Sequence, residues 1–233
     1  MILFVGDTHC PIDIRKLDNS HVKSTCGGVF PHYVIICGDF GAIWSNNVQD
    51  EQEQYWLNWL DSKPFKILFC AGNHENFSRL NNFPKVNMFD SEVRQISDNV
   101  FQLLNGHIYS IDSHKIFVMG GATSTDKHLR TPYIDWWPEE VPTYADYNLA
   151  IENLQKNNYI VNYVVTHTAP ASVLKEKFTY SDRYEDPTSD MLEDLTNRIV
   201  CDKWFFGHMH EDMVFDFHGK EFHALYKNMF YVV

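Results

Sequence analysis

The sequence ILFCAGNHE, residues 67–75, holds the pattern that decides the fold. Its apolar run, Ile67–Cys70, is too short for a typical helix and has no polar face. Continuous apolar runs of this length are typical of β-strands that are covered on both faces. A polar turn, Ala71–Glu75, follows the run at once. The stretch therefore predicts a buried strand with polar side chains gathered at its carboxyl end.

The same pairing of an apolar run with a polar turn occurs four more times along the chain. The turns are Gly6–His9 after Ile2–Val5, Gly38–Asp39 after Tyr33–Cys37, Thr166–His167 after Ile160–Val165, and Gly207–His210 after Trp204–Phe206. Carboxyl ends of parallel strands lie along one edge of an open α/β sheet, and sites form at that edge. We therefore expect two Asp, one Asn and five His to meet in one cleft.

Helical patterns and further strands fill the spaces between these runs. Apolar residues at helical spacing predict helices around residues 56–60, 147–154 and 192–199. Thr143 and Asp146 predict a capping box for the second of these helices. The remaining apolar runs predict a strand at Ile116–Met119, a hairpin made of Met213–Phe217 and Glu221–Leu225, and a strand at Phe230–Val233. Strands that alternate with helices predict an α/β fold.

Residues 120–142 match neither the strand pattern nor the helix pattern. A loop of this length in a compact domain is usually functional or mobile. We interpret it as an insertion over the active-site face of a single domain that spans residues 1–233. Its Trp136 and Trp137 are interpreted first as a hydrophobic plug that packs the insertion down, and second as a surface on which a substrate ring could stack.

The composition narrows the classes of function. With 44% hydrophobic and 21% charged residues among 233, the chain is expected to fold. Nineteen Lys and Arg against 31 Asp and Glu give a net charge of −12, which argues against an extended nucleic-acid groove. Five Cys with no C-x-x-C pair favour reduced thiols over a disulfide framework. No apolar run in the sequence predicts a signal peptide or a membrane span. We therefore expect a cytoplasmic protein.

The residue types in the expected cleft point to metal chemistry. Oxygen and imidazole ligands without thiolate suit Mn, Fe or Zn in a catalytic site better than a structural zinc site. Eight such groups are too many for one catalytic ion and suit two ions that share a carboxylate. Two ions about 3.5–4 Å apart can stabilise both the attacking and the leaving oxygen of a displacement at phosphorus.

The motifs D-x-H, G-D, G-N-H-E, T-H and G-H-x-H occur in this order between Asp7 and His210. In this they resemble the calcineurin-like metallophosphoesterase superfamily. The resemblance implies a two-sheet α/β/β/α sandwich of mixed sheets flanked by helices. It also implies a ligand set: Asp7, His9 and His210 would hold the first ion, Asn73, His167 and His208 the second, and Asp39 would bridge both.

The same resemblance implies a reaction. A metal-bridging hydroxide would hydrolyse a phosphate monoester or diester, a nucleotide being one candidate, with two divalent ions, Mn first and Fe or Zn as alternatives. His74 matches a histidine that is not a ligand and would protonate the leaving oxygen or stabilise its charge. His74 and the bridging Asp39 would be the catalytic residues. The sequence leaves the oligomeric state open.

Two positions depart from the family pattern. Many members have G-D-x-x-D followed by Arg, where the second Asp orients the catalytic His and the Arg grips phosphate. Ala42 and Ile43 occupy these positions here. His74 therefore needs another partner, and Glu75 or an acid from residues 120–142 is the expected one.

The group that grips phosphate must also come from elsewhere. Arg130 is the first candidate and Lys127 the second. Arg130 lies four residues after Asp126, so an ion pair across one helical turn is the simpler interpretation of that residue.

Two other functions remain open from sequence. A scaffold that kept the fold and lost the chemistry is the main alternative, although His74 and every matched ligand are retained. A dinuclear iron protein that handles oxygen is less favoured, because the chain lacks the Glu-x-x-His helical pairs of that class.

Overall fold

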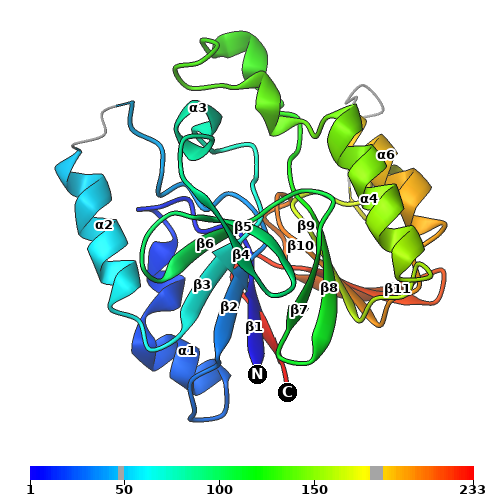
Figure 1. Cartoon of the computed structure of the whole chain (residues 1–233), viewed down its shortest axis with the longest axis horizontal. Helices are drawn as coiled ribbons and strands as arrows, with labels where there is room; N and C mark the ends of the chain where they lie inside the picture. Colours follow the sequence, from blue (N-terminus) through cyan, green and yellow to red (C-terminus); the bar gives the residue numbers. More distant parts are fainter. Residues whose placement is uncertain (47–49, 179–185) are drawn as a thin grey trace.

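Two β-sheets lie face to face, and helices cover the outer face of each sheet (Figure 1). This arrangement comes from a computed structural model, which describes residues 1–46, 50–178 and 186–233. It confirms the predicted α/β sandwich of two mixed sheets flanked by helices. No helix in those three ranges is long and apolar enough to cross a membrane.

The first sheet has seven strands in the order β13-β1-β2-β3-β6-β5-β4. Strands β1, β2, β3 and β6 are parallel, and the strands at both ends of the sheet run antiparallel to their neighbours. The strands are β1 (Ile2–Val5), β2 (Tyr33–Ile36), β3 (Lys66–Phe69), β4 (Lys85–Met88), β5 (Ser91–Gln95), β6 (Val100–Leu103) and β13 (Met229–Val232).

The second sheet has six strands in the order β11-β12-β10-β9-β8-β7. Strands β8, β9, β10 and β12 are parallel, and a hairpin closes each edge. The strands are β7 (Ile108–Ile111), β8 (His114–Met119), β9 (Tyr163–Thr166), β10 (Lys203–Phe206), β11 (Met213–Phe217) and β12 (Lys220–Ala224).

Helices of the two outer layers pack through one apolar face each. On the first sheet these are η1 (Ile14–Leu17), α1 (Asn19–Thr25) and α2 (Glu51–Asp61); on the second they are α4 (Tyr144–Lys156), α5 (Ala171–Lys177) and α6 (Pro187–Thr196). The short elements α3 (Phe77–Leu80), η2 (Lys127–Leu129) and η3 (Pro138–Glu140) complete the set. The predicted capping box of α4 is present, because Thr143 and Asp146 exchange hydrogen bonds between side chain and backbone.

The apolar runs of the central strands are continuous because the side chains on the two faces of each strand pack into two different hydrophobic cores. Along β1, Leu3 and Val5 pack under the helices of the first layer, whereas Ile2 and Phe4 pack between the sheets. Successive side chains of a strand point to opposite faces, so both faces must be apolar when both are covered.

Three details differ from the sequence prediction. The strand expected at Ile160–Val165 begins only at Tyr163, and Ile160 is exposed with a single bridge to Val200. Helix α6 ends at Thr196, so Ile199 lies beyond it, although its side chain is buried. Strands β4–β7 were not predicted. Strands β4 and β7 alternate between more and less exposed residues, and β5 carries few apolar side chains. Strand β6 is buried throughout, but Gln102 interrupts its apolar run.

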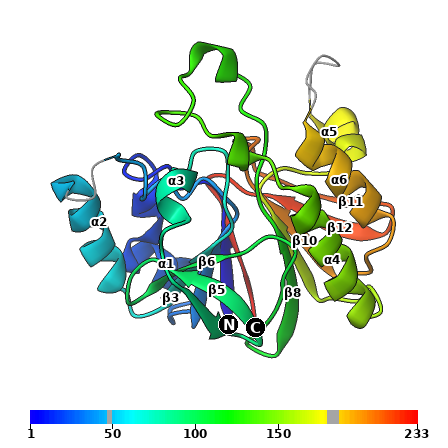
Figure 2. The same cartoon turned by 45° about the horizontal axis from the view of Figure 1, so that its top comes forward.

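The carboxyl ends of the parallel strands meet at one end of the sandwich. Both chain termini lie at the opposite end (Figure 1). Residues 120–142 project beyond the end where the strands meet, as the green segment of Figure 2 shows.

Candidate metal centre

All five predicted turns come together at this end of the two sheets. Each places its polar residues directly after a strand: Asp7 and His9 after β1, Asp39 after β2, Asn73 and His74 after β3, His167 after β9, and His208 and His210 after β10. The side chains form three overlapping groups whose ligand atoms lie within 4.8 Å of one another: Asp7, His9 and His210; His9, Asp39 and His74; Asp39, His167 and His208.

Asp39 lies at the centre of the cluster and belongs to two of its three groups. Its Oδ2 lies 3.1 Å from His9 Nε2, and its Oδ1 lies 3.2 Å from His167 Nε2. The backbone N–H of His74 donates to the same Oδ1 at 2.8 Å. Burial opposes ionisation, but His167, and after it His9 and His74, hold the pKa of the Asp39 carboxyl well below its usual range. The carboxylate is therefore ionised and faces both sides of the cluster.

Asp7 occupies the other buried carboxylate position. Its carboxylate accepts the backbone N–H of His208 at 3.0 Å and 3.1 Å, which fixes its orientation. Its Oδ2 lies 3.0 Å from His210 Nε2, and its side chain is fully buried whereas that of His210 is half exposed.

His167 is the most enclosed of the imidazoles and is fully buried. Its Nδ1 donates to the backbone carbonyl of Cys37 at 2.9 Å, so Nε2 is the nitrogen that faces the cluster. Nε2 lies 3.0 Å from Asn73 Oδ1. Burial opposes the charged ring, but Asp39 and Asp7 outweigh it and raise the pKa of His167 to about 9. Burial is the main cause that lowers the pKa of His208 to about 3, and the positive charge of His167 is the second.

The backbone around the cluster adopts an uncommon conformation. Four of the seven candidate ligands have positive φ: 35° at His9, 48° at Asp39, 62° at His208 and 52° at His210. Residues with a side chain rarely adopt this left-handed region, and strained residues concentrate at functional sites. The sharp turns aim successive side chains into one small volume.

Two glycines of the motifs make room for the carboxylates. A Cβ on Gly72 would lie 2.1 Å from Asp39 Oδ1, and a Cβ on Gly207 would lie 2.0 Å from Asp7 Oδ1. The glycine in G-N-H and the one in G-H-x-H are therefore required where a buried side chain lies against the backbone.

A family model matches the part of the chain that holds these groups. The family model of calcineurin-like phosphoesterases matches residues 1–212, a span that holds all seven candidate ligands. The chain belongs to the calcineurin-like phosphoesterase family. This confirms the resemblance of its motifs and assigns it to a family of metal-dependent phosphoesterases. No curated protein matches the chain.

Solved structures share the fold of this chain. A putative 5′-nucleotidase from Staphylococcus aureus, in complex with alpha-ketoglutarate, is 16% identical with a TM-score of 0.55 over 97% of this chain and 48% of that one. The phosphopantetheinyl hydrolase of Mycobacterium tuberculosis is 14% identical with a TM-score of 0.51, over 97% of this chain and 89% of that one. This chain thus spans about half the length of the Staphylococcus aureus protein. At these identities the likeness establishes the fold.

The donor set of the cluster fits divalent metal ions. Asp39 Oδ1 and Asn73 Oδ1 both converge on His167 Nε2, within 3.2 Å and 3.0 Å. Buried electron-rich atoms converge in this way only around a proton or a cation. Imidazole nitrogens with carboxylate and amide oxygens suit Mn, Fe and Zn.

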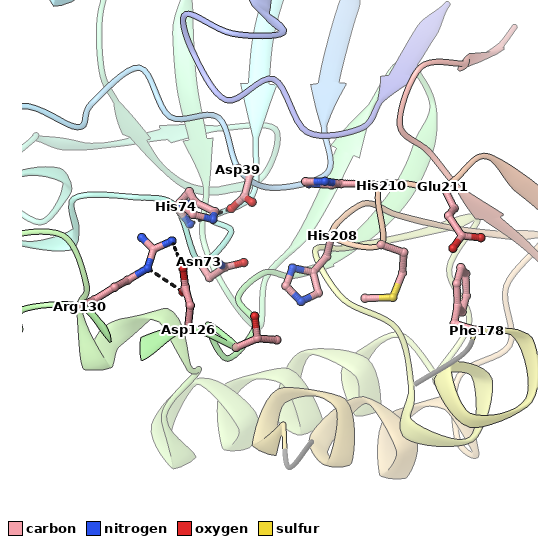
Figure 3. A pocket seen from close by; sticks show the side chains of 11 residues that line it. Asp39, Asn73, His74, Asp126, Arg130, Phe178, His208, His210 and Glu211 are labelled. Atoms are coloured by element: carbon pink, nitrogen blue, oxygen red, sulfur yellow. Dashed lines mark hydrogen bonds and ion pairs between the residues drawn. The ribbon is translucent and has the colours of Figure 1, made fainter. Parts of the chain in front are cut away.

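A cleft of about 380 Å³ opens beside the cluster (Figure 3). The cleft is lined by candidate ligands and His74, together with side chains from three other parts of the chain. These are Thr125, Asp126 and Arg130 from residues 120–142, Phe178 at the end of α5, and Met209 and Glu211 after β10. Figure 3 shows Arg130 and Asp126 on the same side as His74.

Both candidates for gripping phosphate are in this segment, but only Arg130 lies at the cleft. Arg130 donates through Nε and Nη2 to Asp126 at 2.7 Å and 2.9 Å, and through Nη1 to the Asp135 carbonyl at 3.0 Å. The ion pair with Asp126, the simpler interpretation from sequence, is therefore present. Lys127 is exposed and is not among the described residues that line the cleft.

His74 has aromatic and acidic neighbours in place of the orienting carboxylate of other members. Its ring lies 6.0 Å from that of Trp44, which packs edge-on against Trp137 at 5.5 Å. Glu75 instead accepts the backbone N–H groups of Phe40 and Gly41, at 2.8 Å and 3.3 Å. Glu75 thus supports the turn that carries Asp39, and burial raises its pKa to about 8.

The second expected partner of His74 was an acid from residues 120–142, and Asp126 is the acid of that segment that lines the cleft. Asp126 lines the cleft with His74, and the positive charge of His74 contributes to lowering the pKa of Asp126, after its hydrogen bond with Arg130. Burial lowers the pKa of His74 itself. Of the two tryptophans predicted to form a hydrophobic plug, Trp137 is fully buried and donates to Ser78 Oγ at 2.9 Å, whereas Trp136 is only partly buried.

Sequence reasoning missed the residues that support the ligands from behind. Tyr226 stacks on the ring of His210, with centroids 4.8 Å apart and planes 12° apart. Lys16 Nζ donates to the Asp7 carbonyl at 2.6 Å and lies 4.5 Å from the Tyr226 ring centroid. No sequence signal marks these residues, since neither belongs to a motif.

Proposed function

We propose that this protein is a binuclear metal-dependent phosphoesterase that hydrolyses a small phosphate ester, with a diester that contains a nucleotide as one candidate. Residues 1–233 would act as one catalytic domain, with residues 120–142 placed over its active-site face. The observation that carries the proposal is the position of Asp39, whose two carboxylate oxygens face His9 on one side and His167 on the other.

The proposed ligands are the seven residues implied by the motifs. Asp7, His9 and His210 would hold one ion, Asn73, His167 and His208 the other, and Asp39 both. When bound, two divalent ions, Mn first, would lower the pKa of water and stabilise negative charge on the phosphoryl group.

His74 supplies the remaining catalytic group in this proposal. Its backbone N–H is fixed on Asp39 Oδ1 at 2.8 Å, and its imidazole borders the cleft (Figure 3). A proton on an imidazole nitrogen of His74 would pass to the leaving oxygen, or stay there and donate a hydrogen bond to it.

The cleft favours a diester over a monoester as substrate. Arg130 is the single Lys or Arg among the described residues of the cleft lining, and its guanidinium already pairs with Asp126. A monoester carries more negative charge than a diester and would need more cationic groups than this wall offers. Arg130 first, and Lys127 second, remain the proposed phosphate contacts.

The test combines metal analysis with kinetics. Purified protein reconstituted with Mn should hold about two ions per chain, and should hydrolyse bis(p-nitrophenyl) phosphate faster than p-nitrophenyl phosphate. His74→Ala should retain the ions while the rate falls about 10²–10⁴-fold, the usual contribution of a general acid.

His74 lies close enough to His9 and Asp39 to be a ligand itself, so the metal content of the variant decides its role. Parallel loss of metal and rate in His74→Ala would show that it is a ligand. Protein without metal and without turnover of either ester would instead favour the scaffold function.

A further inference from the structure

A buried hydrogen-bond chain links the insertion to the candidate ligand Asn73. Asn73 Nδ2 donates to Ser124 Oγ at 3.1 Å, and Ser124 Oγ donates to Glu140 Oε2 at 2.6 Å. The backbone N–H of Ser124 donates to the other oxygen, Glu140 Oε1, at 2.8 Å. Asn73, Ser124 and Glu140 are 5%, 2% and 1% exposed, so water has little access to compete for these bonds.

The direction of this chain determines which way the amide of Asn73 faces. A carboxylate only accepts hydrogen bonds, so the hydroxyl proton of Ser124 points to Glu140. The Ser124 oxygen then has only lone pairs to offer to Asn73, and the amide must present its NH₂ group there. Its carbonyl oxygen therefore faces the cluster, where Oδ1 lies 3.0 Å from His167 Nε2.

An unsupported amide would not be fixed in this way. The two ends of an Asn side chain have nearly the same shape, so rotation by half a turn would replace a ligand oxygen with an NH₂ group that cannot bind a cation. Glu140 is itself held in place, because its backbone carbonyl accepts the N–H of Ala122 at 3.1 Å.

We propose that Ser124 and Glu140 are positioning residues that keep Asn73 Oδ1 directed at the second metal position. The inference rests on the proposed dinuclear function and adds a role for residues 120–142, which support the metal site from behind the cleft. Outer-shell partners of metal ligands typically contribute about 10–100-fold to metal affinity.

The alternative is that these hydrogen bonds only stabilise the fold of residues 120–142 and do not orient Asn73. The neighbouring Thr123 provides a matched control for that role. It is 3% exposed, and its Oγ1 donates to Asp186 Oδ1 at 3.1 Å, away from Asn73. Removing its hydroxyl disturbs the same loop without touching the amide.

The test is a Mn²⁺ titration followed by electron paramagnetic resonance, which distinguishes a coupled pair of ions from a single ion. In wild-type protein we expect two sites and a coupled signal. Ser124→Ala should weaken one site about 10–100-fold and give an uncoupled signal at Mn²⁺ concentrations that saturate only the other site. Ser124→Thr, which keeps the hydroxyl, should restore the coupled signal, and Thr123→Val should lower the melting temperature alone.

Glu140→Gln provides a second variant if Ser124→Ala does not fold, because it keeps the shape of the side chain and removes one acceptor. It should also weaken one site. The inference is overturned if Ser124→Ala or Glu140→Gln binds two ions with wild-type affinity, or if Thr123→Val loses the second ion equally. A wild-type protein that binds fewer than two ions would instead refute the dinuclear function.

Discussion

Replacing Gly72 with Ala tests the metal centre with a single methyl group. The new Cβ would lie 2.1 Å from Asp39 Oδ1 and 2.3 Å from the Asp39 backbone nitrogen. Real Cβ atoms do not approach other heavy atoms within 3.0 Å, so Asp39 must move by at least about 0.9 Å. Gly72 has no positive φ, so Ala itself adds no backbone strain at this position.

A shift of this size exceeds what a catalytic site tolerates. Productive geometry must be held within about 0.5 Å, and misplacement by about 1 Å can cost about 10²-fold in rate. Asp39 also holds the backbone of His74 at 2.8 Å, so His74 would move with it. We therefore expect Gly72→Ala to lose about 10²-fold in kcat/KM and to bind both ions more weakly.

The assay measures metal content by elemental analysis and turnover of bis(p-nitrophenyl) phosphate, with the melting temperature recorded for each variant. Gly106→Ala is the matched control. Its Cβ would lie 2.6 Å from the Asp146 carbonyl, and Gly106 has a φ of 78°. It should lower the melting temperature and leave the metal content unchanged. A Gly72→Ala protein with two bound ions and wild-type turnover would refute the argument that Asp39, packed against Gly72, must keep its position to bridge the two ions.

Three further predictions concern the two carboxylates, the insertion and a distant histidine. Asp39→Asn should lose more metal than Asp7→Asn by elemental analysis, because Asp39 belongs to two of the three groups and Asp7 to one. Trp137→Ala removes a fully buried indole and should lower the free energy of unfolding by about 3–5 kcal/mol in urea titrations. Burial lowers the pKa of His223 below 6.5, so its contribution to stability is complete above pH 6.5 and is lost as the pH falls below it. His223→Phe should therefore flatten the decline of unfolding free energy as the pH falls below 6.5, by up to about 1.4 kcal/mol per pH unit.

The sequence was most informative where a strand is buried on both faces and its apolar run is unbroken. The runs at Ile2–Val5 and Ile67–Cys70 predict strands β1 and β3 to within a residue, because both of their faces are covered. The edge strand β4 escaped prediction, since its residues alternate between half-buried and exposed and its stability comes from pairing with β5. Tertiary pairing of this kind leaves little trace in a local window of sequence.

The candidate ligands could be predicted because each motif follows a strand whose end is fixed by the sheet. Their supporting residues could not. Ser124 and Glu140 lie 16 residues apart in a segment without periodicity, and only the folded path of that segment brings them to Asn73. Likewise, Glu75 was a reasonable partner for His74 by proximity in sequence, but its side chain points to the turn at Phe40.

The left-handed backbone at His9, Asp39, His208 and His210 lowers the stability of the fold at the four positions where the proposed function needs a side chain. Such a conformation costs about 1–3 kcal/mol at a residue with a side chain, and glycine adopts it freely. Variants selected for heat resistance alone should therefore accumulate glycine at the four positions and become more stable while losing the proposed metal ligands. A selection for more thermostable variants of this protein must therefore measure bound metal at every round.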